Sequence, residues 1–303
     1  MRPVLFYSDD YEADIGPHIF PMRKYRLVKE LLLDMGVATP DDIVEPDTAT
    51  VDDALLVHTR VYVAKLLNGA LSPLEEATLE LPYSKELVEK SFLGAGGTVA
   101  AVRSSFERGV GVNIAGGLHH AFPDHGEGFC VLNDVAMGVA RALEDGLATR
   151  VATVDCDVHQ GNGTAAIFAG DERVFTFSIH QERNFPMAKP ASSLDIGLPD
   201  EADGPLYLSN LESALDTIFS EFSPEMVLYV AGADPYEHDL LGGLALTKQD
   251  LADRDEAVMS ACASRGVPFV VTLAGGYAER TSDTAEIHAA TIARAITVGE
   301  SLP

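Results

Sequence analysis

A chain of 303 residues with 47% hydrophobic residues is long enough to bury a substantial core, which excludes an intrinsically disordered protein. Its 47 acidic residues exceed its 21 basic residues and give a formal net charge of -26. This balance argues against binding nucleic acid or an anionic membrane through bulk electrostatics. A saline habitat and a well-solvated surface that resists association explain the acidic excess equally well.

The cysteines and the apolar segments bound the cellular location. Cys130, Cys156 and Cys262 are an odd number without a short spacing, so neither a disulfide framework nor a thiolate zinc site is indicated. The N-terminal residues do not resemble a signal peptide, and no apolar segment is long enough to span a bilayer. We therefore expect a cytoplasmic protein.

Short apolar runs alternate with helical patterns along the chain. Strands are predicted, in chain order, at residues 4–7, 111–115, 151–154, 174–179, 226–230 and 268–273. Helices are predicted at residues 23–33, 62–67, 85–106, 133–147, 164–168, 207–219, 249–264 and 284–296. This alternation is typical of a mostly parallel sheet with helices on both faces. We therefore expect an α/β fold with residues 1–303 in a single domain.

Two segments interrupt this regular pattern. Gly94, Gly96 and Gly97 lie within the helix at 85–106 and predict that it packs close to a neighbouring backbone. Residues 181–205 have no regular pattern, and so long a loop in a compact domain is typical of a functional rim rather than a linker.

The strongest candidate site follows the strand at 151–154. Side chains on a strand alternate between faces, so Asp155, Asp157 and His159 are predicted to point the same way. Asp234 follows the strand at 226–230, and the carboxyl ends of parallel strands share one edge of a sheet. Asp157, His159 and Asp234 then provide three oxygen or nitrogen donors, as in a catalytic zinc site that leaves one position open. Burying two acids without a cation is costly, which favours this reading.

Two further strand ends carry reactive groups. His119 and His120 follow the strand at 111–115, and Tyr277 follows a glycine pair after the strand at 268–273. The histidines could accept a proton from water, and the tyrosine could stabilise an oxyanion. Simpler explanations remain, because adjacent histidines are often polar loop residues and a Gly-Gly-Tyr sequence is often a turn. Asp234 precedes a proline and could cap a turn instead.

The motifs at these strand ends resemble a known family. Five segments are similar, in the same order, to the motifs of the zinc-dependent histone deacetylase family: Gly116 to Ala121, Gly128 to Asp134, Asp155 to His159, Gly232 to Asp234 and Gly275 to Tyr277. The resemblance extends from His18 to Tyr277, and residues 160–163 (Gln-Gly-Asn-Gly) resemble the class IV and bacterial branch. It implies the arginase/deacetylase fold and one histone-deacetylase-like catalytic domain, residues 1–303.

The resemblance also implies a role for each site residue. It assigns one catalytic zinc ion to Asp157, His159 and Asp234, and stabilisation of the oxyanion to Tyr277. His120 is the principal general base and then acid, His119 assists it, and Asp155 orients His119. A structural potassium ion is implied beside Asp155, with ligands from Asp155, Asp157, His159, Ser178 and Ile179. The acyl-lysine tunnel is implied to be lined by Phe129, Phe185, Gly128 and Leu241.

Asn162 departs from the pattern of many family members, which have an aspartate beside the second histidine. An amide can orient His120 but cannot stabilise its charged form, so we predict a lower His120 pKa than in aspartate-bearing enzymes. Leu241 takes the place where polyamine-selective relatives carry an acidic residue, so selectivity for cationic polyamines has no support in the sequence.

The resemblance implies a zinc-dependent deacylase that hydrolyses the amide of acetyl-lysine or a longer acyl-lysine. Its substrate is an acylated lysine peptide, a protein or a small acylated amine, and neither nucleic acid nor membrane is expected as a partner. Acyl length and oligomeric state stay open. One alternative is a ureohydrolase of the arginase type, which binds two manganese ions and needs more carboxylates. Another is a non-catalytic module that binds acyl-lysine or a small molecule.

Overall fold

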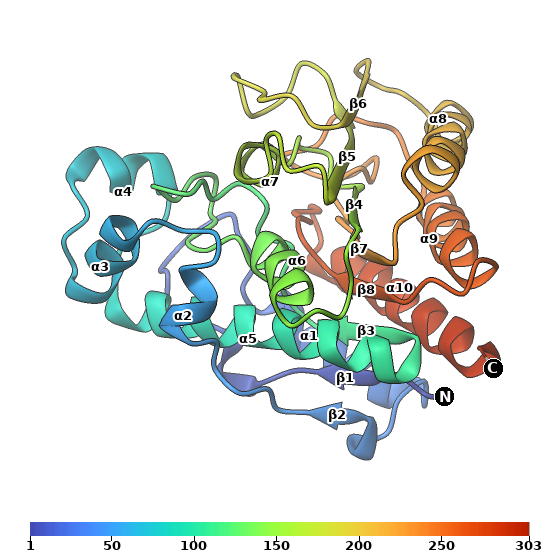
Figure 1. The fold of residues 1–303 in the computed structure, drawn as a ribbon, viewed down its shortest axis with the longest axis horizontal. Coiled ribbons are helices and arrows are strands. Elements are labelled where there is room, and N and C mark those ends of the chain that lie inside the picture. The colour runs from blue at the N-terminus through green and yellow to red at the C-terminus, as the bar shows by residue number, and fades with distance from the viewer. Residues whose placement is uncertain (303) are drawn as a thin grey trace.

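One sheet organises the computed structural model, which describes residues 1–302. The sheet has eight strands in the order β2-β1-β3-β8-β7-β4-β5-β6, and every pairing is parallel (Figure 1). The strands are β1 (Val4–Phe6), β2 (Ile43–Val44), β3 (Val110–Asn113), β4 (Val151–Asp155), β5 (Val174–Gln181), β6 (Leu194–Leu198), β7 (Met226–Val230) and β8 (Phe269–Thr272).

Helices cover both faces of the sheet. Helices α5 and α6 pack against each other on one side, and α1, α10, α9 and α8 form a continuous series on the other (Figure 1). The helices are α1 (Lys24–Asp34), α2 (Val51–Ala54), α3 (Arg60–Asn68), α4 (Pro73–Leu79), α5 (Lys85–Arg108), α6 (Asp134–Glu144), α7 (Asn162–Ile167), α8 (Gly204–Thr217), α9 (Lys248–Ala263) and α10 (Thr281–Ser301). Three shorter helical segments are η1 (Asp9–Tyr11), η2 (Pro40–Asp42) and η3 (Ile218–Phe222).

The predicted α/β fold with a parallel sheet is confirmed, and the central strands show why the sequence predicts it. Every residue of β3, β4, β7 and β8 is buried, so side chains on both faces of these strands lie in the core. A parallel sheet that is covered on both faces produces continuous apolar runs of this kind, and it is these runs that the sequence displays. The chain is a single α/β domain around this sheet.

Helix ends differ from the predicted ones because capping residues lie outside the apolar pattern. Helix α8 begins at Gly204 rather than at 207, because the Asp203 side chain caps it by accepting a hydrogen bond from the backbone N–H of Leu206. Helix α10 extends from Thr281 to Ser301, beyond the predicted 284–296. Each predicted helix is nevertheless present.

The prediction of an irregular segment at 181–205 was wrong in part, because β6 forms within it and pairs with β5. The sequence Leu194-Asp195-Ile196-Gly197-Leu198 alternates apolar residues with Asp195 and Gly197, as in an edge strand with one exposed side. That alternation is weaker than the continuous runs of the central strands. Strand β2 and helices α2 and α4 are short and were also not predicted.

Glycines allow α5 to approach its neighbours closely at two positions. A Cβ atom on Gly96 would lie 2.0 Å from the carbonyl oxygen of Asp47, and one on Gly97 would lie 2.2 Å from the Tyr11 hydroxyl. The predicted approach to a neighbouring backbone is therefore confirmed at Gly96, whereas the close neighbours of Gly97 are side chains. The prediction is wrong for Gly94, where a Cβ atom would have no neighbouring atom of the described residues within 4 Å.

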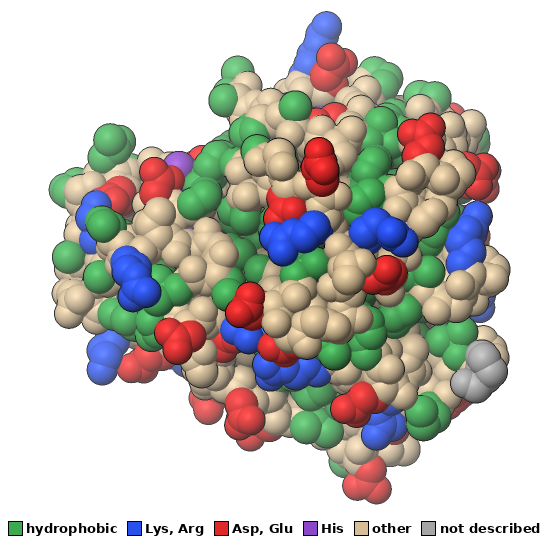
Figure 2. All heavy atoms as spheres, viewed as in Figure 1, with side chains coloured by type: hydrophobic (Ala, Val, Ile, Leu, Met, Phe, Trp, Pro, Cys, Tyr) green, Lys and Arg blue, Asp and Glu red, His purple; other side chains and the backbone are tan. Residues whose placement is uncertain are grey.

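Charged side chains of both signs lie on the face of the molecule that Figure 2 shows. Acidic and basic side chains are interspersed on it. Among residues 1–302, no helix has both the length and the hydropathy that a bilayer crossing requires.

Candidate active site

Four neighbouring strands deliver the candidate residues to one edge of the sheet. Strands β3, β8, β7 and β4 are adjacent in that order. The segments that follow their carboxyl ends carry the residues singled out in the sequence, namely His119 and His120, Tyr277, Asp234, and Asp157 with His159. These residues meet because carboxyl ends of parallel strands lie at the same edge.

Asp157, His159 and Asp234 form a buried cluster with the geometry of a metal site. One ligand-type atom from each lies within 4.8 Å of the other two, and this is the only such group in the described part of the chain. Nδ1 of His159 is 3.0 Å from Asp157 Oδ1 and 3.4 Å from Asp234 Oδ2. Asp234 Oδ2 is buried and, apart from this 3.4 Å approach of His159, has no hydrogen-bond partner within residues 1–302. A buried carboxylate oxygen with so little hydrogen bonding is suited to binding a cation.

The other carboxylate oxygens of this cluster are held by backbone groups. Asp157 Oδ2 accepts a hydrogen bond of 2.8 Å from Gly275 N–H, and Asp234 Oδ1 accepts one of 2.9 Å from Val158 N–H. A Cβ atom on Gly275 would lie 1.9 Å from Asp234 Oδ2, and one on Gly232 would lie 2.7 Å from Asp157 Oδ2. Glycine is therefore required at 232 and 275, since a side chain would displace the carboxylates.

The electrostatics of this cluster favour a cation. Burial alone would lower the pKa of His159, but hydrogen bonds and charges of Asp157 and Asp234 raise it to about 10. Burial and the charge of Asp157 raise the pKa of Asp234 to about 7. A proton on His159 thus balances the two carboxylates. A divalent metal ion fits the same three side chains and would compete with that proton.

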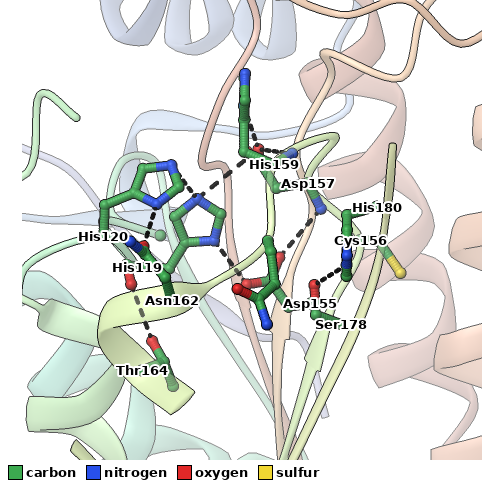
Figure 3. A network of polar contacts seen from close by, with 12 residues as sticks. His119, His120, Asp155, Cys156, Asp157, His159, Asn162, Thr164, Ser178 and His180 are labelled. Carbon is green, nitrogen blue, oxygen red and sulfur yellow. Dashed lines mark hydrogen bonds and ion pairs between the residues drawn. The ribbon is translucent and has the colours of Figure 1, made fainter. Parts of the chain in front are cut away.

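The predicted common direction of Asp155, Asp157 and His159 was wrong. Strand β4 ends at Asp155, and the chain then turns, with Asp157 N–H donating to Asp155 Oδ1 at 3.1 Å. Asp155 Oδ2 lies 2.6 Å from Nδ1 of His119 (Figure 3). Asp157 and His159 instead lie beside Asp234, with Nδ1 of His159 3.4 Å from Asp234 Oδ2. Strand alternation does not apply beyond the end of the strand, so the three residues separate into two groups.

His119 and His120 form a pair with different partners. Their Nε2 atoms are 3.1 Å apart, and His120 Nδ1 is 2.7 Å from Oδ1 of Asn162 (Figure 3). Burial would lower the pKa of His119, but the charges of Asp155 and Asp157 raise it to about 9. Burial, with the charges of His119 and of His159, holds the pKa of His120 well below its usual range. His119 is therefore the more basic of the two rings.

Burial is the largest cause of the low pKa of His120. The Asn162 hydrogen bond raises this pKa and opposes only part of the effect. The difference from aspartate-bearing enzymes stays a prediction.

Tyr277 lies in a loop that is fixed from several sides. Burial raises its pKa well above the usual range, so the hydroxyl keeps its proton. The Tyr277 N–H donates to Asp239 Oδ2 at 2.6 Å. The ammonium group of Lys24, which is fully buried, donates to the carbonyl of Ala274 at 2.6 Å. Ala274 has a positive φ of 55°, a strained value for a non-glycine residue.

A pocket leads from the surface to these groups. It is lined by His18, Glu80, His120, Gly128, Phe129, His159, Asn184, Phe185, Leu241 and Tyr277. All four predicted tunnel residues are among them. Phe185 and Asn184 come from the 181–205 segment, so part of that segment does form a rim. Phe129 adopts a positive φ of 68°, held in a turn in which Cys130 N–H donates to the carbonyl of Glu127 at 2.9 Å.

The predicted potassium ligands lie on the neighbouring strands β4 and β5 and in the segment that follows β4. Ser178 on β5 is the register partner of Asp155 on β4, and both side chains are buried. Ser178 Oγ is 3.0 Å from Nδ1 of His180 (Figure 3). Ile179 follows Ser178 on β5 and is also buried.

A buried arginine supports the two strand ends that bear the metal-ligand candidates. Arg254 on α9 donates from Nη1 to the carbonyls of Gly232 and Cys156, at 2.5 and 3.4 Å. Its Nε and Nη2 atoms donate to Asp255 Oδ1 at 3.1 and 2.8 Å. Gly232 and Cys156 precede Asp234 and Asp157, so the guanidinium group connects α9 to both ligand segments.

Several of these residues were not found in the sequence, although some left a signal. Lys24 lies four and eight residues before Val28 and Leu32, on the buried face of α1. Arg254 likewise lies on the buried face of α9 with Leu251 and Val258. A charged residue in an apolar helical stripe was thus the available signal. Asp239 sits in a loop and left no such periodicity.

Known proteins resemble this chain over most of its length. A family model described as the histone deacetylase domain matches residues 18–293. An uncharacterized protein of Picosynechococcus sp. is 41% identical over 94% of this chain and 95% of that protein. Histone deacetylase 2 of Arabidopsis thaliana is 29% identical over 90% of this chain and 74% of its own length. The acetoin utilization protein AcuC of Staphylococcus aureus is 30% identical over 77% of this chain and 66% of its own.

Solved structures share the fold. An HDAC homologue from Aquifex aeolicus matches with a TM-score of 0.84 and 24% identity, covering 98% of this chain and 84% of that chain. The HD domain of HDA15 matches with a TM-score of 0.80 and 22% identity, covering 98% and 92%. The sheet described above is therefore the arginase/deacetylase fold. Together with the family match, these likenesses show that the chain belongs to the histone deacetylase family and resembles its bacterial members.

Proposed function

We propose that this protein is a zinc-dependent deacylase that hydrolyses the amide bond of acetyl-lysine or a longer acyl-lysine. The substrate is a peptide, a protein or a small acylated amine. The observation that carries the proposal is the convergence of Asp157, His159 and Asp234 beside His120 and Tyr277 at one pocket. Membership of the histone deacetylase family supports the same reaction class.

The donor set fits one zinc ion. Imidazole and carboxylate groups are zinc ligands, three of them in a buried cluster leave a position open for water, and Asp234 Oδ2 has no close hydrogen-bond partner in the described chain. Bound there, zinc would supply Lewis-acid chemistry, polarising the substrate carbonyl and lowering the pKa of a water molecule. Gly232 and Gly275 keep the carboxylates free to face the ion.

The histidine pair would move protons. Neutral His120 can accept a proton from the attacking water at Nε2 and later return it to the leaving amine. His119 lies beside it at 3.1 Å and would assist it, with its own orientation fixed by Asp155 at 2.6 Å. We assign the orienting role for His120 to Asn162.

Tyr277 would stabilise the oxyanion that forms when the amide carbonyl is attacked. Its raised pKa keeps a proton on the hydroxyl, so the side chain can donate a hydrogen bond where negative charge develops. The bond from Tyr277 N–H to Asp239 and the bond from Lys24 to Ala274 hold its loop in place. A donor held in place before the reaction costs little reorganisation during it.

We also propose the structural potassium ion beside Asp155, with ligands from Asp155, Asp157, His159, Ser178 and Ile179. Burial raises the pKa of Asp155, which indicates a desolvated carboxylate that a nearby cation would stabilise. The Ser178 hydroxyl can donate its proton to His180 and still direct a lone pair at a cation. Higher thermal stability in potassium than in an equal concentration of tetramethylammonium would support the site, and equal stability would oppose it.

The pocket supports lysine-type amides over polyamines. Phe129 and Phe185 provide apolar walls for an acyl-lysine side chain, and Leu241 adds no charge. Asp239, two residues before Leu241 in the chain, is directed inward, where its oxygens accept from the backbone N–H groups of Leu241, Gly242 and Tyr277. Glu80 is the only acid among the described lining residues.

Two other functions remain to be separated from this one. A ureohydrolase of the arginase type would hold two metal ions, whereas residues 1–302 contain one cluster of three ligands. Metal stoichiometry in the purified protein separates these two. A non-catalytic binding module would bind acyl-lysine without turnover.

A substrate panel tests the proposal. Acyl-lysine peptides of increasing chain length and acylated small amines, including polyamines, are assayed on one preparation whose zinc content is measured. We expect turnover of at least one acyl-lysine substrate at about one zinc per chain. Tyr277→Phe should lower kcat at least about a hundredfold with zinc retained. Tyr83→Phe serves as the control, because the hydroxyl of Tyr83 donates to the carbonyl of Leu66, away from the pocket. Activity on no substrate, or an active Tyr277→Phe, would overturn it.

A further inference from the structure

The amide of Asn162 is hydrogen-bonded on both sides, and its second partner is a carboxylate. Oδ1 lies 2.7 Å from Nδ1 of His120, and Nδ2 donates to Oε1 of Glu127 at 3.0 Å. Glu127 comes from the loop after β3, whereas Asn162 begins α7. The carboxylate of Glu127 is therefore connected to His120 through the neutral side-chain amide of Asn162.

The chemistry of these groups allows the bonds to run in one direction only. An ionised carboxylate accepts hydrogen bonds and donates none, so Glu127 must face the NH₂ group of Asn162. The amide oxygen then faces His120, and an oxygen can only accept, so His120 Nδ1 carries the proton. Nε2 of neutral His120 is left with a lone pair, which faces Nε2 of His119 at 3.1 Å.

The reverse arrangement would disable His120 as a base. If the Asn162 amide were rotated by half a turn, its NH₂ group would donate to Nδ1 of His120. The proton of the neutral ring would then be on Nε2, the atom that has to accept a proton. Asn162 alone can adopt both orientations because the two ends of an amide have similar shapes. Glu127 removes that ambiguity.

Glu127 is well placed for this task. Its backbone is fixed in the turn that also carries Phe129, with bonds between Glu127 and Cys130 in both directions, at 2.9 and 3.3 Å. Its second carboxylate oxygen is 3.4 Å from Nε2 of His125. Its side chain is 19% exposed, so the bond to Asn162 is partly shielded from water.

We propose that Glu127 is a positioning residue that sets the orientation of the Asn162 amide and thereby keeps the proton of neutral His120 on Nδ1 and the lone pair on Nε2. The inference rests on the proposed function in that it gives His120 the role of general base. In this arrangement the carboxylate of Glu127 acts on His120 through the amide of Asn162 rather than by direct contact.

A double-mutant cycle tests the direction of these bonds. Glu127→Gln keeps the size of the side chain but permits both orientations of Asn162, so kcat should fall on the order of fivefold with KM unchanged, the effect of replacing a charge-assisted by a neutral hydrogen bond. Asn162→Asp puts two carboxylates within 3.0 Å, and kcat should fall. Adding Glu127→Gln to Asn162→Asp should raise kcat, because the introduced amide can donate to the new carboxylate.

The reversal of sign between the two backgrounds is the diagnostic result, since a merely structural glutamate would give the same sign in both. Asp124→Asn is the matched control, because it removes a negative charge from the same loop, where the Asp124 carboxylate contacts His125 rather than Asn162. Glu127→Gln lowering kcat in both backgrounds, or no more than Asp124→Asn does, would overturn the inference.

Imidazole nitrogen NMR tests the same point without an activity assay. In protein labelled with ¹⁵N-histidine, with His120 assigned by its loss in His120→Phe, the wild type should show the Nδ1–H form of His120. Glu127→Gln should populate the Nε2–H form. An unchanged His120 tautomer in that variant would refute the inference, even if no deacylase substrate is found, and an inactive wild type would refute the proposed function alone.

Discussion

Replacing Arg254 tests how much of the stability of the site depends on one buried cation. Arg254→Met keeps the length of the side chain and removes the charge. The guanidinium group is fully buried, and so is its partner Asp255 at 1% exposure. Without Arg254, the Asp255 charge stays buried, and the carbonyls of Gly232 and Cys156 lose a donor.

The magnitude follows from what remains around Asp255. Removing one partner of a buried ion pair costs about 3–5 kcal/mol of unfolding free energy. The low end applies here, because the hydroxyls of Tyr229 and Thr291 still donate to the Asp255 carboxylate. For a chain of 303 residues, an unfolding entropy of about 2.1 cal/mol/K per residue converts about 3 kcal/mol into a Tm lower by about 5 °C.

Differential scanning calorimetry on the purified protein measures this shift. Arg265→Met is the matched control, because Arg265 lies just after α9, is partly exposed, and is 3.9 Å from its only ion-pair partner in the described chain, Asp216. It should change Tm by about 1 °C at most. Adding Asp255→Asn to Arg254→Met removes the unpaired charge and should recover part of the loss. A drop below about 1 °C in Arg254→Met, or no recovery in the double variant, would refute the reasoning.

Two further predictions concern the metal-ligand cluster. Gly275→Ala places a Cβ 1.9 Å from Asp234 Oδ2 and should weaken zinc binding at least about tenfold in chelator competition. Gly94→Ala is the control, because open space surrounds Gly94, and it should leave zinc affinity unchanged. Equal zinc affinity in the two variants would count against the crowding argument. In the metal-free protein, His159 and Asp234 have pKa values raised from 6.5 to about 10 and from 3.8 to about 7, so the folded state binds more protons than the unfolded state. Stability is then present at low pH and is lost as pH rises, through about 4–7 for Asp234 and 6.5–10 for His159. The Tm of chelator-treated protein should therefore fall from about pH 6.5 to about pH 9, and the gain in Tm on adding zinc should grow; a flat or rising Tm without metal would contradict this.

The sequence predicts the framework of the site better than its internal bonds. The central strands appear as continuous apolar runs because both of their faces are buried, and the residues that follow them could be placed at one edge without knowing any contact. Strand β6 has one exposed side and was missed. Helix ends shifted wherever a side chain such as Asp203 supplied the cap.

The bonds between side chains depend on loop geometry that no periodicity encodes. Asp155 was predicted to face the same way as Asp157, but the chain turns directly after Asp155 and leaves it facing His119. Glu127 and Asn162 are 35 residues apart in different loops, and nothing in either segment indicates that they meet. Such pairs become visible only when the fold brings the loops together.

The position of β8 bears on how the protein comes to be active as it is made. Strand β8 lies between β3 and β7, so the last strand of the described chain joins the part built from β1 to β3 to the part built from β4 to β7. On the ribosome, these two parts have no common strand until residues 269–272 have emerged. Tyr277, Gly275 and the bond from Gly275 to Asp157 follow β8 directly. The candidate site is therefore completed only after β8 and the residues up to Tyr277 have emerged, because the sheet edge that carries it is not closed before then.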